Sequence, residues 1–262
     1  MIDELLQTAR IPAGEFLMGS DHADEDERPV HPVYIDEFYL ASRPVTNAEY
    51  ARFVRETGYR PIVVRDLPTC VSPEARDAFR QLAQRYVWTE DEPPKGLETH
   101  PVTLVQYADA LEYCRWLAAV TGKAIRLPTE AEWEKAARGG LDGRRYPWGD
   151  EIDPSRANFL TDSALKARGG TEPVGSYSCN GYDLYDMAGN VWQWVSDWYD
   201  PDYYPTSEYR NPQGPPVGRF RCVRGGSWVN DDVSFLRCAH RHEVPADTYV
   251  YSIGFRIAYS SA

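Results

Sequence analysis

The 262-residue sequence has no apolar run close to the ~18 residues that a membrane-spanning helix needs, so we expect no membrane span. Residues Met1–Leu6 also lack the basic and apolar regions of a signal peptide, which predicts a cytoplasmic protein. Lysine is scarce, with 4 residues against 24 arginines, and the basic residues form no cluster or stripe. Together with a formal net charge of −12, this pattern excludes nucleic acid as an expected partner.

Cysteine is scarce as well. No two of the five cysteines have the CxxC spacing, so we expect no thiolate zinc site. Without an export signal, reduced thiols are expected. The sequence also has no phosphate-binding loop, nucleophile elbow or HExxH motif. The common signatures of nucleotide-binding enzymes, serine hydrolases and zinc peptidases are therefore missing.

Aromatic and turn-forming residues are abundant instead. The chain has 8 Trp and 18 Tyr, and its 20 Pro and 19 Gly predict many turns and long ordered loops. A hydrophobic fraction of 42% is enough for a substantial core. We interpret residues 1–262 as a single domain, in which segment 59–99, with a predicted helix over 73–86, is an elaboration on the core.

Three capping boxes predict where helices begin. A Thr hydroxyl that accepts from the N3 amide, and a Glu or Gln three residues later that reaches back, would start helices near Thr46, Thr103 and Thr129. Glycines predict the ends of the second and third helices at Gly122 and Gly139. Alternating or apolar runs predict strands over 11–19, 33–40, 191–198, 222–228 and 253–258, the last two as a pair.

Two features of the sequence are weak indications of a cation-binding site. The acidic segment 21–28 has the charge for one, but its spacing fits no EF-hand, and a solvated loop is the favoured interpretation. His240 and His242 would share one face of a strand, with Glu243 beside them, which would suit iron or zinc. No third ligand has a characteristic spacing to these histidines.

The last forty residues alternate between patterned and unpatterned segments. Three blocks, 224–228, 236–241 and 253–258, are rich in Arg and Gly, which favour pinned strands and close backbone approach. Two stretches between them, 229–235 and 242–252, are unpatterned, and we expect their side chains to form a binding surface. Rigid aromatic anchors are typical of such surfaces, although packing into the core is the alternative for Phe235, Tyr249 and Tyr251. The candidate ligand-binding residues are Asn230, Asp231, Asp232, Ser234, Phe235, His240, His242, Glu243, Asp247, Tyr249 and Tyr251.

Several motifs in order resemble those of the formylglycine-generating enzyme (sulfatase-modifying factor) family, across nearly the whole chain. They are 11–19 (IPAGEFLMG), 44–46 (PVT), 126–134 (RLPTEAEWE), 147–149 (PWG), 189–192 (GNVW), 224–228 (RGGSW) and 254–256 (GFR). The resemblance implies a single domain with a C-type-lectin-like α+β fold that is poor in regular structure. It also implies two calcium sites. At each of them, the alternative is that the Asn only caps a turn, and the two interpretations are equally favoured. One would use Asn158, the Phe159 carbonyl and Asp162, and the other Asn190 with the carbonyl of Val191, where Gln193 replaces a Glu that is frequent in relatives.

The oxidases of this family, by the same resemblance, hold copper(I) between two cysteines in the pattern RGGS-aromatic-x-Cys-x4-Cys. Copper(I) is soft and needs thiolates. Asn230 and Phe235 occupy the two positions in this chain, so copper is not expected. The tail is also similar to the variable proteins of diversity-generating retroelements, in which a fixed scaffold carries residues that are diversified.

The sequence therefore favours a non-catalytic protein that binds an unidentified protein, peptide or glycan through 229–235 and 242–252. A formylglycine-generating oxidase, or a related metal-dependent oxygenase, is the alternative.

Overall fold

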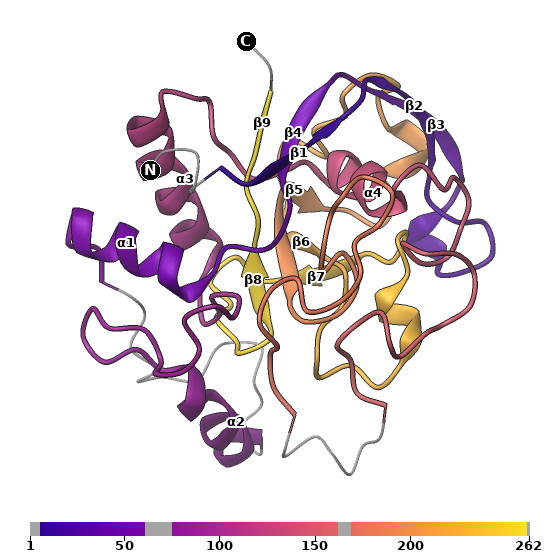
Figure 1. The fold of residues 1–262 in the computed structure, drawn as a ribbon. Helices are drawn as coiled ribbons and strands as arrows, with labels where there is room; N and C mark the ends of the chain where they lie inside the picture. Colours follow the sequence, from indigo (N-terminus) through magenta and orange to yellow (C-terminus); the bar gives the residue numbers. More distant parts are fainter. Residues whose placement is uncertain (1–5, 61–74, 162–168, 261–262) are drawn as a thin grey trace.

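A computed structural model describes residues 6–60, 75–161 and 169–260. Its strands form three small sheets (Figure 1). The first has the antiparallel order β1 (Thr8–Ile11), β4 (Phe38–Ala41), β9 (Ala258–Ser260). The second pairs β2 (Gly14–Met18) with β3 (His31–Ile35). The described residues therefore confirm a mixed α/β fold with short strands and few helices.

The third sheet holds the end of the chain. Its order is β7 (His242–Val244), β6 (Phe220–Arg224), β5 (Trp192–Tyr199) and β8 (Ile253–Phe255). The prediction of a central strand over 191–198 is confirmed, since β5 has a neighbour on each side. The predicted pairing of 222–228 with 253–258 is wrong, because β5 lies between β6 and β8 and pairs with β8 in parallel.

The helices are α1 (Asn47–Thr57), α2 (Arg76–Ala83), α3 (Tyr107–Thr121) and α4 (Glu130–Arg138), with short 3-10 helices η1 (Glu25–Glu27), η3 (Gln84–Tyr86), η5 (Tyr204–Thr206) and η6 (Val233–Leu236). Capping boxes at Thr46 and Thr129 are confirmed. The helix start predicted at Thr103 is wrong. Leu104 has a φ of 58°, which a right-handed helix cannot include. The amide of Gln106 donates to Asp109 instead, at 2.7 Å, and α3 begins at the next residue.

The predicted strand over 33–40 is also two strands, in different sheets. The two strands are separated at Asp36. Its backbone amide donates to the side chain of Asn211 at 2.9 Å and so does not take part in the hydrogen bonding between strands. The predicted strand over 11–19 is divided in the same way, between β1 and β2. Beyond β6, Gly225 and Gly226 have φ values of 98° and 71°, so the predicted strand 222–228 ends early.

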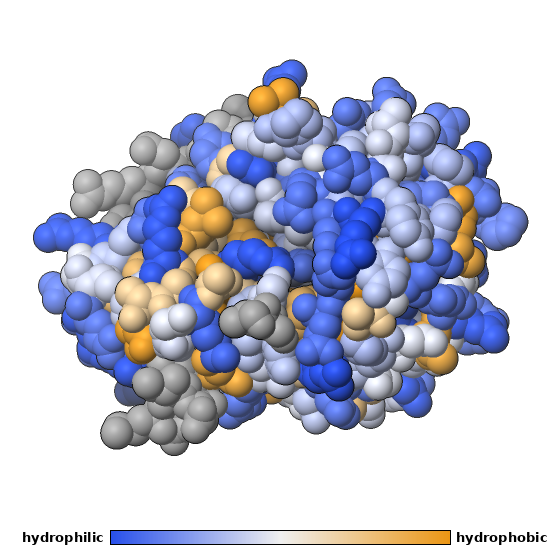
Figure 2. All heavy atoms as spheres, turned by 90° about the horizontal axis from the view of Figure 1, so that it is seen from above, coloured by the Kyte–Doolittle hydropathy of each residue, from blue (hydrophilic) through white to orange (hydrophobic). Residues whose placement is uncertain are grey.

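The core contains unusually large side chains. Trp133, Trp194 and Trp228 are almost fully buried, and so are two arginines, Arg224 and Arg256. Most of the face in Figure 2 is hydrophilic, with apolar side chains gathered on the side where α1 and α3 lie. No helix in the described ranges is long and apolar enough to cross a bilayer.

Candidate functional site

Buried arginines hold the patterned blocks of the tail in place. Arg224, at the end of β6, contacts Glu130 at 3.0 Å and Glu134 at 2.6 Å, both on α4. It also donates to the backbone carbonyl of Cys238 at 2.6 Å. Arg241 contacts the same Glu130 at 2.9 Å. β6 and the residue that precedes β7 are thereby fixed to one helix by charge-assisted hydrogen bonds.

Glu130 is the centre of this network. Burial opposes its ionisation, but the guanidiniums of Arg241 and Arg224 outweigh burial and lower the pKa of Glu130 to about 2. The carboxylate therefore stays charged at neutral pH. Such a group holds the scaffold rigid and is unsuited to transferring a proton.

The first unpatterned stretch, 229–235, contains a turn that Asn230 closes. The side-chain carbonyl of Asn230 accepts hydrogen bonds from the amide and the hydroxyl of Ser227, both at 2.8 Å. Its backbone carbonyl accepts from Leu160 at 2.9 Å. Asn230 thus closes a turn, and its side chain points back to the scaffold. The exposed residues of the stretch are Asp231 and Asp232.

Phe235 joins the two unpatterned stretches. Its half-buried ring lies 5.9 Å from the ring of Trp192 and 6.2 Å from that of His242, edge to face in both pairs. His242 in turn stacks on Trp192 at 4.9 Å. Sequence reasoning missed Trp192, because only the fold brings this residue of β5 against the tail. We call the group Asp231, Asp232, Ser234, Phe235, His242 and Glu243 the tail surface.

The second stretch is largely covered. Tyr249 is buried, with 9% of its surface exposed, in a cluster with Phe79, Tyr86 and Trp228. The ring of Tyr251 lies 5.5 Å from that of Phe79, on α2, and 6.4 Å from that of Tyr86. The expectation that Tyr249 is a displayed anchor was therefore wrong, because α2 and η3 of the elaboration pack over it, whereas Tyr251 is half-buried and its role as an anchor stays a prediction. Asp247 is exposed at the neighbouring turn, where its backbone carbonyl accepts from Gln106.

His240 is buried too, with 8% of its surface exposed, so it cannot be an open contact residue. Its imidazole faces Asp24 and Glu27 of the acidic segment. His242 points instead to Trp192, and Glu243 is exposed. The two histidines therefore remain neighbours, with ring centroids 6.3 Å apart, and His240 is the one that faces the acidic segment.

The two predicted calcium positions are next to each other. The side-chain amide of Asn158 donates to Asn190 at 3.3 Å and to the carbonyl of Gly170 at 2.9 Å. Asn190 exchanges hydrogen bonds with the backbone of Glu172 at 3.0 and 3.1 Å. These bonds show both asparagines bracing loops, and calcium at Asn158, Phe159, Asn190 or Val191 stays a prediction. Asp162 lies outside the described residues.

The described cysteines offer no exposed thiolate pair. Cys114, Cys222 and Cys238 are buried, and burial raises the pKa of Cys114 and Cys238 to about 12 and that of Cys222 well above its usual value. These three thiols are protonated at neutral pH. The sulfur of Cys222 donates to Glu130 at 3.0 Å, inside the arginine network.

Known proteins match the chain over nearly its whole length. Residues 3–261 match the family described as sulfatase-modifying factor enzyme 1-like domain. A formylglycine-generating enzyme of Streptomyces coelicolor is 38% identical over 282 residues, which cover 95% of this chain and 88% of that protein. A Chlamydia caviae protein named serine/threonine-protein kinase pkn1 is 40% identical over 252 residues, which cover 95% of this chain. The match spans only 37% of that longer relative.

Two solved structures share the fold. PvdO from Pseudomonas aeruginosa has a TM-score of 0.78 at 26% identity, with 97% of this chain and 94% of that chain covered. Treponema denticola variable protein 1 has a TM-score of 0.74 at 21% identity, with 97% and 95% covered. The fold thus occurs both in a formylglycine-generating enzyme family and in a protein named as variable.

Proposed function

This chain belongs to the sulfatase-modifying factor (formylglycine-generating enzyme) family, and we propose that within it the protein binds a ligand without catalysing a reaction. The ligand would be a protein, peptide or glycan, held by the tail surface. One observation carries the proposal: the side chains at 230 and 235 contain no sulfur and are engaged in the fold. Asn230 is bonded to Ser227, and Phe235 packs on Trp192.

Oxidase chemistry in this family, as its motif pattern implies, needs a pair of thiolates facing each other at these two positions. Among the described residues, the other thiols do not supply such a pair at neutral pH. Cys222 and Cys238 are buried with raised pKa values, and their nearest charged groups belong to the arginine network. A copper site would require that network to be rebuilt.

The tail surface has the composition of a recognition patch. Asp231, Asp232 and Glu243 are exposed and carry negative charge, and Phe235 and His242 present partly exposed rings fixed on Trp192. Fixed aromatic rings lose little entropy on binding, and surrounding carboxylates select partners with positive charge or hydrogen-bond donors. The scaffold beneath is held by buried ion pairs, so the surface residues can change without loss of the fold.

Diversification of the tail is the finer part of the proposal. The likeness to the Treponema protein concerns the fold alone, so the support comes from the alternation of fixed blocks and unpatterned stretches. If the tail is diversified, DNA downstream of the gene holds a near-copy of the tail coding sequence, with adenines at the varied codons, beside a reverse transcriptase gene. Absence of such a copy would remove diversification and leave binding in place.

The identity to named formylglycine-generating enzymes favours the oxidase as the second candidate. The two functions separate in one assay, in which the protein is incubated with copper(I), oxygen and a cysteine-containing sulfatase peptide. The Streptomyces coelicolor relative serves as the positive control. We expect no aldehyde from this chain, and aldehyde formation would overturn the proposal.

Binding is tested with a random-peptide display library and a glycan array. The double variant Asp231→Lys, Glu243→Lys reverses charge on the tail surface. Asp202→Lys, Glu208→Lys makes the same change at exposed positions elsewhere. We expect the first variant to lose the selected ligands and the second to keep them. Equal binding by both variants would place the ligand on another face.

A further inference from the structure

The acidic segment and the tail meet at one place in the fold. Asp24 precedes η1, and Glu27 ends it. An Asp24 carboxylate oxygen lies 3.3 Å from Nδ1 of His240, and Oε1 of Glu27 lies 3.8 Å from the same nitrogen. All three atoms lie within 4.8 Å of one another. Two sequence features that are weak separately thus form one cluster with three potential metal ligands.

One buried oxygen of this cluster has no hydrogen-bond partner. The Glu27 side chain is completely buried, and its Oε2 accepts from Arg237 at 2.6 Å. Its Oε1 has no hydrogen-bond partner, although it is aimed at the imidazole of His240. A buried carboxylate oxygen without a partner costs free energy, and in native proteins such an atom usually has a donor, a water or an ion beside it.

Charge points to a cation as the missing partner. Asp24 and Glu27 together bring two negative charges, and Arg237 is the guanidinium that contacts both, at 2.9 and 2.6 Å. The imidazole of His240 is itself buried, and its Nε2 has no hydrogen-bond partner.

We propose that Asp24, Glu27 and His240 bind a divalent transition metal, with Zn²⁺ as the ion that this donor set fits. One imidazole and two carboxylates are ligands that zinc accepts, whereas calcium selects sites made of oxygen alone. Three protein ligands leave a coordination position for water. Arg237 contacts all three residues, since its Nη2 lies 2.9 Å from Asp24 and 3.5 Å from Nδ1 of His240 and its Nη1 lies 2.6 Å from Glu27, and such hydrogen-bonding partners orient metal ligands.

The ion has a route to the site. The side chain of Asp24 is 57% exposed. A cavity of about 270 Å³, lined in part by Ala23, Arg237 and Ala239, lies next to the cluster. The imidazole of His240 also borders the tail surface, since its ring lies 5.0 Å from that of Phe235 and 6.3 Å from that of His242. Asp24 and Glu27 lie outside the tail surface, so Asp24→Asn tests zinc binding without changing a residue of that surface.

The test is calorimetric titration of the chelator-treated full chain with Zn²⁺ at pH 7. We expect one site, weakened on the order of 100-fold in Asp24→Asn and Glu27→Gln. Glu25→Gln, which removes the same charge from the exposed face of η1, and His242→Gln should bind as the wild type does. Asp24→Asn changes a largely exposed side chain, so it keeps the test valid if Glu27→Gln does not fold.

Cobalt(II) substitution identifies the ligands. Visible bands that disappear in His240→Gln and persist in His242→Gln are expected. A sulfur-to-cobalt charge-transfer band would overturn the proposal, because a cysteine would then be the ligand. Failure of the wild type to bind Zn²⁺, or unchanged binding by both Asp24→Asn and Glu27→Gln, would overturn it as well.

Discussion

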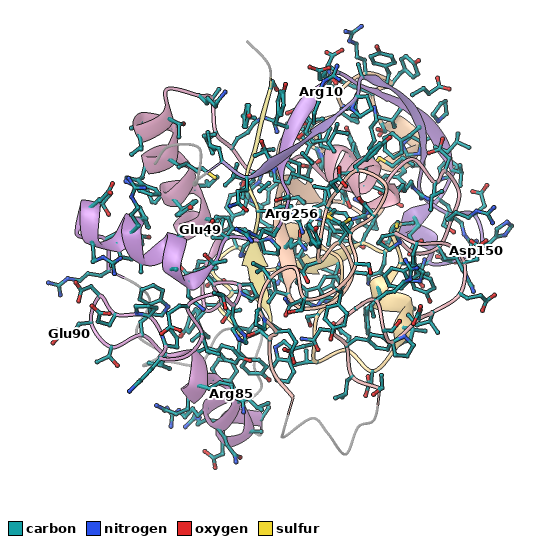
Figure 3. The ribbon with its side chains drawn as sticks, viewed as in Figure 1. Arg10, Glu49, Arg85, Glu90, Asp150 and Arg256 are labelled. Atoms are coloured by element: carbon teal, nitrogen blue, oxygen red, sulfur yellow. The ribbon has the colours of Figure 1, made fainter. Side chains whose placement is uncertain are left out.

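The Nε of Arg256 donates to the side-chain carbonyl of Gln193 over 2.6 Å, and both residues are completely buried. Arg256 lies near the centre of the molecule, whereas Arg10, Glu90 and Asp150 lie toward its edges (Figure 3). Its other hydrogen bonds go to the backbone carbonyls of Ala41, Tyr185 and Asp186. Burial lowers the pKa of Arg256 to about 9, and an amide replaces the carboxylate that usually accompanies a buried guanidinium.

Gln193→Leu should therefore destabilise the protein by about 3 kcal/mol or more, as expected when a buried charged donor loses its acceptor. Trp133 would lose its acceptor at the same time, since its indole also donates to Gln193, at 2.8 Å. Urea unfolding measures the change. Gln213→Leu, at an exposed position, is the control and should stay within ~0.5 kcal/mol. A small effect at both positions would contradict the role assigned to Gln193.

The effect of a tail substitution on stability should depend on whether the residue is buried or exposed. Tyr249→Ala removes a buried ring and should cost on the order of 3 kcal/mol, whereas Asp231→Asn should change stability by less than ~0.5 kcal/mol. From the sequence alone, all four of Asp231, Phe235, Tyr249 and Tyr251 are expected to be surface residues. Exchanging them together would then change the melting temperature very little. The packing of α2 now predicts a clear decrease, which thermal melting of the single variants would attribute to the tyrosines. Equal, small shifts would restore the earlier expectation.

The packing of α2 over the tail can also be tested by substitutions in α2 itself. Phe79→Ala, on α2, removes the ring that contacts Tyr251 and should cost about 3–5 kcal/mol, the usual range for a buried Phe. Arg80→Ala on the exposed face of α2 is the matched control. We also expect faster hydrogen exchange across 249–251 in Phe79→Ala alone. Unchanged exchange there would mean that α2 does not protect the tail.

Stability should fall as pH rises through 7. Burial, together with the charge of Glu130, raises the pKa of Asp197 to about 7. A carboxyl whose pKa is higher in the folded than in the unfolded protein adds stability at low pH, and that stability is lost as pH increases toward the folded pKa. Asp197→Asn should therefore match the wild type near pH 4 and exceed it at pH 8, with a gap that grows by up to about 1.4 kcal/mol per pH unit between about pH 4 and 7. Asp200→Asn is the control in chemical unfolding at both pH values, and a constant gap would contradict the shift.

Local features of the fold were predictable from sequence, and long-range pairings were not. The boxes at Thr46 and Thr129 need only four consecutive residues, so they were found, whereas Thr103 failed because the backbone at Leu104 turns left-handed. The place of β5 between β6 and β8 follows from how the whole core packs. The cluster of Asp24 with His240 joins segments more than two hundred residues apart, and neither segment carries a spacing that reveals the other.

The order of the sheets has a consequence for synthesis of the chain. β4 pairs with β9, and β5 pairs with β8, so both sheets take a strand from the last ten described residues. A chain emerging from the ribosome cannot complete either sheet until residues 253–260 have been made. Until then, the edges of β4 and β5 stay open to wrong partners.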